Sequence, residues 1–375
     1  MRSLTTLAVA AATALHGLAS PPARVEIEIP EPPIPAVVDT QRVLVYELHV
    51  TSFARTPLEL LRVEVLGGAA RPLATYTDSA LAALLRPIGE MQGMHDAQGM
   101  ADPARLEPGR RVVVYLWIPL PHDGSVPDTL LNRLVFTPAD SSASPQNETV
   151  AEAAVRVHRA ESLVLAPPLP GGVWLAGDGP SNASDHRRAL GAFGGRTYIA
   201  QRFAIDWVLV GPNGDTHQGD ATRNEHYWGF GQPVLAVADG EVTEVVDSIP
   251  DHPPHVLPAA VTLANIAGNH IILRVAPHRY VLYAHLQHGS VRVRVHERVQ
   301  RGQAVARLGD SGQATAPHLH LDVVDGSSVL GAEGVPWVLR SYADLGPGST
   351  FELNAHPDVR RSLALPGENE VVRWQ

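Results

Sequence analysis

The 375-residue sequence contains no cysteine. Disulfides, thiolate metal ligands and a cysteine nucleophile are therefore excluded, and any transition metal must be bound by histidine, aspartate or glutamate. The 18 histidines supply ample imidazole for such a site. Because cysteine is missing altogether, its usage says nothing about the redox compartment.

Lysine is absent too, so all 29 basic residues are arginines, in a chain of formal net charge -10. No basic run stands out, and nucleic acid is not expected as a partner. Beyond the N-terminus, no apolar run reaches the roughly 20 residues that a membrane-spanning helix needs. We therefore do not expect an integral membrane protein.

The composition that remains is that of a folded, β-rich protein. Apolar residues make up 45% and charged residues 18%, which are ordinary globular values, and glycine and proline number 32 each. Both residues interrupt helices and mark turns. At roughly 150 residues per domain, the length predicts about two domains.

The first 20 residues have the pattern of a secretory signal peptide. Arg2 supplies a positive charge, the stretch from Leu4 to Leu18 is mostly apolar, and Gly17 and Ala19 are small residues suited to a cleavage site. The alternative is a buried N-terminal helix. The signal pattern predicts an exported protein in the periplasm, the cell wall or the extracellular space.

Composition then divides the rest of the chain. Residues 21–37 are proline-rich and predict an extended linker or an edge segment. Residues 38–166 contain short alternating runs that predict an antiparallel, Ig-like β-sandwich. A helix followed by a loop is expected within 78–101. A second, antiparallel β domain is expected over 167–345, and the tail at 346–375 carries no recognisable motif. The sandwich can be a binding module, a spacer or plain scaffold.

Two hairpins are predicted in the second domain. Apolar runs at 233–238 and 241–246 flank Asp239 and Gly240, which is a strong hairpin signal. The runs at 270–275 and 280–286 suggest another.

Several residues in this second domain suit metal chemistry. His318 and His320 are two apart on an expected strand, so they share one face, with Leu319 on the other. Such a pair suits two metal ligands, or one ligand beside a catalytic base. His285 lies on the second hairpin, and Asp206 follows an apolar run, where a buried carboxylate needs a partner or a metal.

Together these segments resemble the lysostaphin/LytM-like zinc endopeptidases, which cleave peptide cross-links of bacterial peptidoglycan. The resemblance spans residues 180–325 and does not extend to 38–160. The matching stretches are FAIDW at 203–207, GQPVLAVADGEVTEVV at 231–246, GNHIILRV at 268–275, YVLYAHL at 280–286 and VQRGQAVARLGDSGQATAPHLHLDV at 299–323.

The resemblance implies a zinc endopeptidase that hydrolyses peptidoglycan stem peptides or cross-bridges with a metal-activated water. It implies one Zn2+ per chain, with Asp206 and His320 as metal ligands. His318 matches the catalytic histidine that moves protons, and His285 matches the second catalytic or transition-state-stabilising histidine.

One position departs from the family pattern. The first zinc ligand should be a histidine four residues before Asp206, where this chain has Arg202. Arginine stays protonated and cannot bind zinc. His186 is the preferred replacement, because glycines at 191, 194 and 195 can turn the chain back toward the site. His217 and His226 are lesser candidates.

The other interpretation of Arg202 is that zinc is not bound. The protein would then be a catalytically inactive module that binds and activates other cell-wall hydrolases. A metal-binding cupin sandwich is disfavoured, because no glutamate closely follows His320. His252 and His255 are interpreted as part of a surface turn. The sequence does not indicate which peptide bond is cleaved or the oligomeric state.

Overall fold

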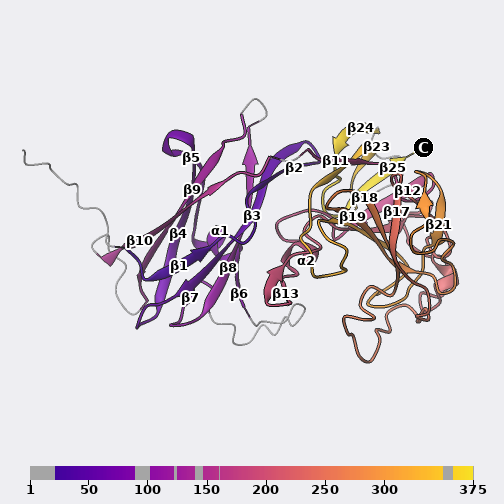
Figure 1. Ribbon diagram of the computed structural model, residues 1–375, viewed down its shortest axis with the longest axis horizontal. Coiled ribbons are helices and arrows are strands. Elements are labelled where there is room, and N and C mark those ends of the chain that lie inside the picture. The colour runs from indigo at the N-terminus through magenta and orange to yellow at the C-terminus, as the bar shows by residue number, and fades with distance from the viewer. Residues whose placement is uncertain are drawn as a thin grey trace, which may run out of the picture.

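The computed structural model describes residues 22–88, 102–121, 125–139, 147–159, 161–348 and 358–374. The predicted signal peptide at 1–20 and the loop expected after residue 88 lie outside or mostly outside these ranges. The described residues form two β-rich lobes, an N-terminal one and a C-terminal one (Figure 1). No helix within these ranges is long and apolar enough to cross a membrane.

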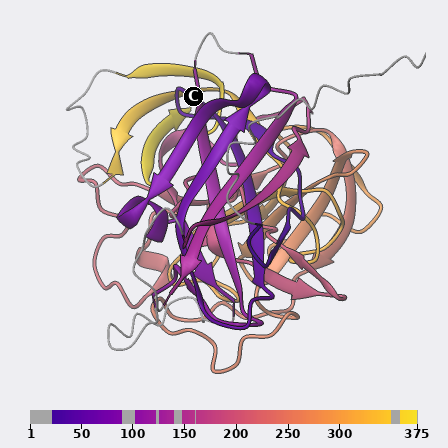
Figure 2. The same cartoon turned by 90° about the vertical axis from the view of Figure 1, so that its left-hand side faces the viewer.

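The N-terminal lobe is a sandwich of two antiparallel five-stranded sheets (Figure 2). One sheet contains β1 (Val25–Glu28), β2 (Ile34–Val38), β3 (Gln41–Ser52), β6 (Leu85–Pro87) and β8 (Arg111–Leu120). The other contains β4 (Leu58–Gly67), β5 (Arg71–Thr77), β7 (Arg105–Leu106), β9 (Thr129–Pro138) and β10 (Thr149–Arg156). A short 3-10 helix η1 (Gly68–Ala70) precedes β5, and helix α1 (Asp78–Ala82) follows it, where a helix was expected.

Strand β3 is buried on both of its faces. Leu44 and Leu48, on one face, belong to the core between the two sheets. Val43 and Val45, on the other, pack into the core of the C-terminal lobe. Because alternate residues of a strand point to opposite faces, the next residue of the second set, Glu47, is also directed at the C-terminal lobe. The two lobes thus share an apolar interface.

The C-terminal lobe is built on an eleven-stranded sheet. In spatial order its strands are β11 (Leu163–Leu165), β23 (Trp337–Pro347), β25 (Glu370–Trp374), β12 (Gly172–Gly177), β15 (Ile205–Leu209), β22 (Leu319–Val324), β19 (Arg279–Leu286), β18 (Asn269–Ala276), β17 (Gly240–Val246) and β20 (Arg298–Val299), with β24 (Val359–Ala364) paired to β23. Two ribbons flank it, β13 (Gly191–Phe193) with β14 (Arg196–Tyr198) and β16 (Pro233–Leu235) with β21 (Ala304–Arg307). The expectation of a mainly β, antiparallel protein is confirmed.

The structure differs from the sequence predictions at both ends of the chain. Within the proline-rich segment, β1 and β2 each pair with β3, and β1 is the outermost strand of its sheet, which agrees with an edge segment and not with a linker. Within the expected tail, β24 and β25 each pair with β23. The short apolar stretches of these four strands become buried when they complete the sheets. The proline content at one end and the lack of a motif at the other did not indicate these strands.

The hairpin predicted at Asp239 and Gly240 is wrong. Strand β16 pairs with β21, and β17 pairs with β18 and β20. A Cβ at Gly240 would lie 2.7 Å from the Arg274 carbonyl oxygen, so glycine here permits a close approach to β18. The second hairpin, β18 with β19, is confirmed.

Candidate metal centre and its histidines

Three adjacent strands position the centre of the site. Asp206 on β15 lies opposite His320 on β22, and His320 lies opposite Ala284 on β19. Directly opposed residues on an antiparallel pair have close Cβ atoms. His320 Nδ1 consequently approaches Asp206 Oδ1 to 2.8 Å. Leu319 faces the core behind the sheet, as the alternation predicts.

His186 reaches this centre from outside the sheet. It belongs to the one-turn helix α2 (Asp185–Arg188), and its Nε2 is 3.6 Å from Asp206 Oδ2. Its ring lies 4.8 Å from that of His320. The Nδ1–H donates to the carbonyl of Asp178 at 2.9 Å. This bond fixes the tautomer and leaves the Nε2 lone pair directed at the carboxylate.

Glycines turn the chain between His186 and Asp206, as the sequence suggests. Strands β13 and β14 form a hairpin whose two central residues, Gly194 and Gly195, have φ of +58° and +84°. Positive φ at both central positions is what a two-residue hairpin turn requires.

His318 and His285 stand beside the carboxylate–imidazole group. His318 Nε2 is 3.4 Å from Asp206 Oδ2, and the His285 ring is 4.7 Å from that of His318. Each Nδ1 lies 2.8 Å from a backbone carbonyl, of Ala316 for His318 and of Ser311 for His285. His285 also has a φ of +59°, a left-handed conformation that is uncommon outside glycine and is often found at functional sites.

Burial and neighbouring charges tune the proton affinities here. Burial lowers the pKa of both His186 and His285, so their rings favour the neutral form. Burial raises the pKa of Asp206, but the imidazoles of His318, His186 and His320 outweigh it and hold that pKa well below its usual range. Burial lowers the pKa of His320, but the neighbouring carboxylates of Asp206 and Asp322 outweigh it and raise the pKa to about 10.

His186, Asp206 and His320 can together hold one metal ion. Each offers a ligand atom, and these atoms all lie within 4.8 Å of one another. Two imidazoles and one carboxylate form a ligand set that zinc accepts, with a further position left open. We call these three residues the ligand cluster. On the donor chemistry, the residues present fit zinc.

Asp322 is a site residue that the sequence analysis missed. It is fully buried 3.5 Å from His320 Nε2, and neither of its carboxylate oxygens has a hydrogen-bond donor among the described residues. Burial raises its pKa. A carboxylate behind a metal-binding imidazole orients the ring and increases its basicity. The two-residue period that places His318 and His320 on one face of the strand also places Asp322 there. The sequence therefore contained the pattern that could have identified Asp322.

Arg202, at the family's ligand position, turns away from the site. It is 2% exposed. Its Nη2 is 2.8 Å from Glu47 Oε2, and its Nη1 is 2.9 Å from Glu333 Oε2. Arg187, next to His186, also forms an ion pair with Glu47. We call Glu47, Arg187, Arg202 and Glu333 the interface cluster, because it joins β3 of the sandwich to the C-terminal lobe.

The remaining candidate histidines are engaged elsewhere. His217 stacks on Tyr227, and the His226 ring accepts from the backbone N–H of Asp220. His252 contacts the Gly312 carbonyl, and His255 contacts the Tyr227 hydroxyl. None of these four joins the ligand cluster. A separate acidic group, Asp39 with Asp344 and Glu370, already holds the guanidinium of Arg361.

A cavity of about 500 Å³ opens over the site. The imidazoles of His186, His285, His318 and His320 share its lining with apolar side chains, among them Leu190, Phe193, Leu282, Val329 and Leu330. Polar groups gathered beside apolar side chains in one cavity are typical of a ligand-binding site.

Comparison with known proteins finds a family match for part of the C-terminal lobe. Residues 227–330 match the family described as Peptidase family M23. This range contains His285, His318 and His320, whereas Asp206 and His186 lie upstream of it. No curated protein matches the sequence.

Solved structures with similarity to the chain include M23 proteins. A mutant of the catalytic domain of the prophage-encoded M23 protein EnpA from Enterococcus faecalis is 21% identical, with a TM-score of 0.28, over 46% of this chain and 93% of that one. The deep-sea M23 metalloprotease Pseudoalterin is 14% identical, with a TM-score of 0.29, over 57% and 98%. A zinc-containing peptidase from Vibrio cholerae is 14% identical, with a TM-score of 0.21, over 80% and 81%.

At such low similarity the structural likenesses carry no assignment of activity, and the identification depends on the family match. The chain therefore carries a domain of peptidase family M23, as its resemblance to the lysostaphin/LytM-like enzymes predicts.

Proposed function

We propose that the protein is a zinc-dependent endopeptidase that hydrolyses peptide bonds in bacterial peptidoglycan stem peptides or cross-bridges. One observation carries the proposal. Although Arg202 has replaced the family's first ligand, His186 lies beside Asp206 and His320 and restores a set of two imidazoles and a carboxylate. The predicted signal peptide supports export, which is part of the proposal.

His186 Nε2, the Asp206 carboxylate and His320 Nδ1 would hold one zinc ion per chain. When bound, zinc acts as a Lewis acid that polarises the scissile carbonyl and makes water a stronger nucleophile at neutral pH. Asp322 holds the His320 ring from behind, so that Nδ1 keeps facing Asp206. The Asp178 carbonyl does the same for His186.

His318 and His285 handle the protons. Each ring donates its Nδ1–H to a backbone carbonyl, so Nε2 of the neutral ring is an acceptor. His318 Nε2, close to the Asp206 carboxylate, would take a proton from the attacking water and later pass it to the leaving amine. His285, held neutral by burial, would accept a hydrogen bond from that water and orient it.

A second function is favoured by Arg202 alone. A module that binds no zinc and activates other cell-wall hydrolases needs no ligand at that position. It gives no reason for His186 to converge on Asp206 through a hairpin and a separate helix.

Digestion of purified peptidoglycan tests the proposal. The full-length mature protein, treated with a chelator and then reloaded with zinc, should release peptide fragments with new amino termini, and the chelated protein should release none. Mass spectrometry of the fragments would identify the bond. If the reloaded protein released nothing but raised the activity of an added wall hydrolase, the activator function would replace the enzyme.

A further inference from the structure

We propose that the N-terminal sandwich is a structural part of the metal centre, because Glu47 clamps the helix that carries His186. The proposal rests on the proposed function in so far as His186 is a metal ligand. In this proposal the sandwich helps to complete the set of metal ligands. The sequence alone suggested only a spacer, a scaffold or a binding module.

Glu47 is the central residue of the clamp. It is 2% exposed and lies on the face of β3 that is directed at the C-terminal lobe. Its carboxylate pairs with Arg187, the neighbour of His186 in α2, and with Arg202, four residues before Asp206. One carboxylate of the sandwich therefore fastens both segments that lead to the ligand cluster.

Other sandwich groups hold the same helix. Arg187 Nη2 donates to the Tyr46 carbonyl at 3.1 Å, and Arg188 Nη2 donates to the Ala83 carbonyl at 3.0 Å. The Arg188 guanidinium also lies 4.4 Å from the centre of the Tyr115 ring. A helix of one turn has no independent stability. The position of α2, and with it that of His186, therefore depends on the sandwich.

The clamp also accounts for the residue at the family's ligand position. The Arg202 side chain forms ion pairs with Glu47 at 2.8 Å and with Glu333 at 2.9 Å. It therefore stabilises the interface between the lobes and does not point toward the ligand cluster. The same Glu47 then holds the helix that supplies the replacement ligand. The change of ligand and the docking of the sandwich are thus two consequences of one buried ion cluster.

Glu47→Gln in the full-length protein is the test, with Glu64→Gln as the matched control. Glu64 also pairs with two arginines, Arg62 and Arg133, but in the other sheet of the sandwich. We expect hydrogen exchange of the metal-free protein to accelerate at least tenfold in residues 180–190 in Glu47→Gln only. We also expect its zinc affinity to fall at least tenfold and its cobalt(II) visible spectrum to change.

A double-variant cycle shows whether Glu47 acts through His186. In a His186→Ala background, where only the Asp206 segment is still affected through Arg202, Glu47→Gln should reduce zinc affinity by a much smaller factor than it does in the wild type. Unchanged hydrogen exchange and unchanged zinc affinity in Glu47→Gln would overturn the clamp. If Glu47→Gln does not fold, Arg188→Gln, which removes the Ala83 and Tyr115 contacts and a hydrogen bond to the Asn182 carbonyl but keeps the Glu47 pairs, takes its place. If the wild type binds no zinc, the proposed function fails, whereas the exchange of metal-free α2 still tests the clamp.

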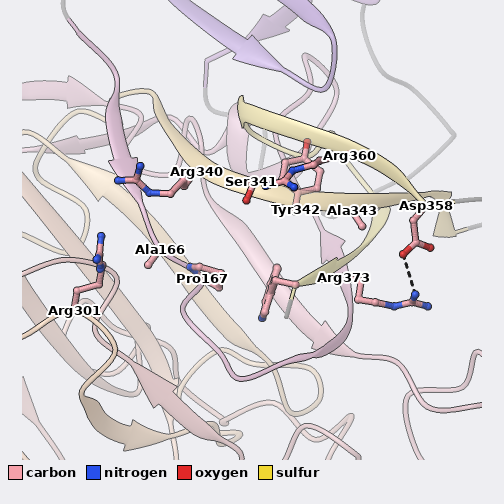
Figure 3. Close-up of a pocket in the computed structure, with 11 residues that line it drawn as sticks. Ala166, Pro167, Arg301, Arg340, Ser341, Tyr342, Ala343, Asp358, Arg360 and Arg373 are labelled. Atoms are coloured by element: carbon pink, nitrogen blue, oxygen red, sulfur yellow. Dashed lines mark hydrogen bonds and ion pairs between the residues drawn. The ribbon is translucent and has the colours of Figure 1, made fainter.

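A second, independent inference concerns a pocket on the C-terminal strands (Figure 3). Its volume is about 420 Å³, and its lining includes Arg301, Arg340, Arg360 and Arg373. Arg373 pairs with Asp358 at 3.0 Å. Within the described ranges, no carboxylate pairs with the side chains of the other three arginines.

The geometry points to an anion-binding site in this pocket. Three arginines without a carboxylate partner among the described residues line this pocket in a chain of net charge -10, and an anion bound there would be attracted by all three. Guanidinium forks bind phosphate and carboxylate in a bidentate manner. Trp374 gives its Nε1–H to the carbonyls of Leu169 and Pro170, so it offers only its ring to a ligand. The ligand class is a compact molecule with several phosphate or carboxylate groups.

Titration calorimetry at physiological salt tests this site, with inorganic pyrophosphate and citrate as the two probes. We expect saturable binding of one or both, weakened at least tenfold in the Arg340→Gln/Arg360→Gln double variant. Arg298→Gln, an exposed arginine elsewhere, is the control. The probe that binds more tightly indicates which anion is preferred. No saturable binding to the wild type, or equal binding to the double variant, would contradict the inference.

Discussion

Two buried clusters meet at helix α2, and they accommodate charge in opposite ways. The interface cluster sets two carboxylates against two guanidiniums, so its formal charges cancel within the protein. The ligand cluster sets one carboxylate between two imidazoles: burial favours the neutral form of His186, whereas the carboxylates of Asp206 and Asp322 favour the charged form of His320. The first cluster needs no ligand, whereas the second gathers donor atoms that a metal ion can bind in exchange for the proton on His320.

With the proposed function, the difference explains how a metal site would change one ligand and keep its chemistry. Arg202 belongs to the interface cluster and His186 to the ligand cluster, although the family pattern places the first ligand at residue 202. A position in the family pattern is therefore a weaker guide than the geometry around Asp206. Variants in each cluster should have distinct effects.

The largest effect is expected for His318→Ala. His318 lies beside the ligand cluster without belonging to it, so this variant should keep zinc while the catalytic rate falls by about 10²- to 10⁴-fold, the usual contribution of a general base. The measurement is hydrolysis of peptidoglycan beside zinc content. A variant that lost zinc would show that His318 is a ligand.

Arg202→Gln should break the interface cluster. Removing one partner of a buried ion pair leaves an uncompensated charge, here on Glu333, while Glu47 keeps Arg187; such a loss typically costs about 3–5 kcal/mol. We expect denaturant unfolding of the metal-free protein to show a loss of that size. A loss below about 1 kcal/mol would mean that Arg202 carries little of the interface.

Acid should also weaken the interface cluster. Burial raises the pKa of Glu47, but Arg187 and Arg202 outweigh it and lower the pKa to about 2, from 4.5. Because the folded pKa is the lower one, this stabilisation is present above pH 4.5 and is lost as the pH falls toward 2. The shift corresponds to about 3 kcal/mol.

Comparison with Glu47→Gln isolates that contribution. The difference in unfolding free energy between wild type and variant should shrink over this pH range, because the glutamine does not titrate. A difference that stays constant from pH 5 to pH 2 would place the titration elsewhere.

Asp322→Asn is expected to have the smallest effect. The asparagine keeps the shape behind His320 but removes the charge that orients the ring, and such outer-shell changes weaken metal binding by about 10- to 100-fold. Competition with a zinc chelator measures it. Wild-type affinity in this variant would show that Asp322 only fills space.

The sequence predicted the parts of the site that depend on local period and motif. Alternation placed His318 and His320 on one face with Leu319 in the core, and the glycine run predicted the turn that returns His186. The contact of Glu47 with Arg187 and Arg202 joins residues more than 130 positions apart across two lobes, so no local pattern could reveal it. For the same reason the pairing of β25 with β12 was missed, because it joins the two ends of the C-terminal lobe, as in the pair of Gly172 with Trp374.

The most direct test of the central claim is the zinc content of the purified mature protein, determined by elemental mass spectrometry beside His186→Ala and His226→Ala. The structure predicts about one zinc per chain in the wild type and in His226→Ala, and almost none in His186→Ala. Zinc retained at full stoichiometry in His186→Ala would contradict the account, because the ligand missing at Arg202 would then be supplied by another residue.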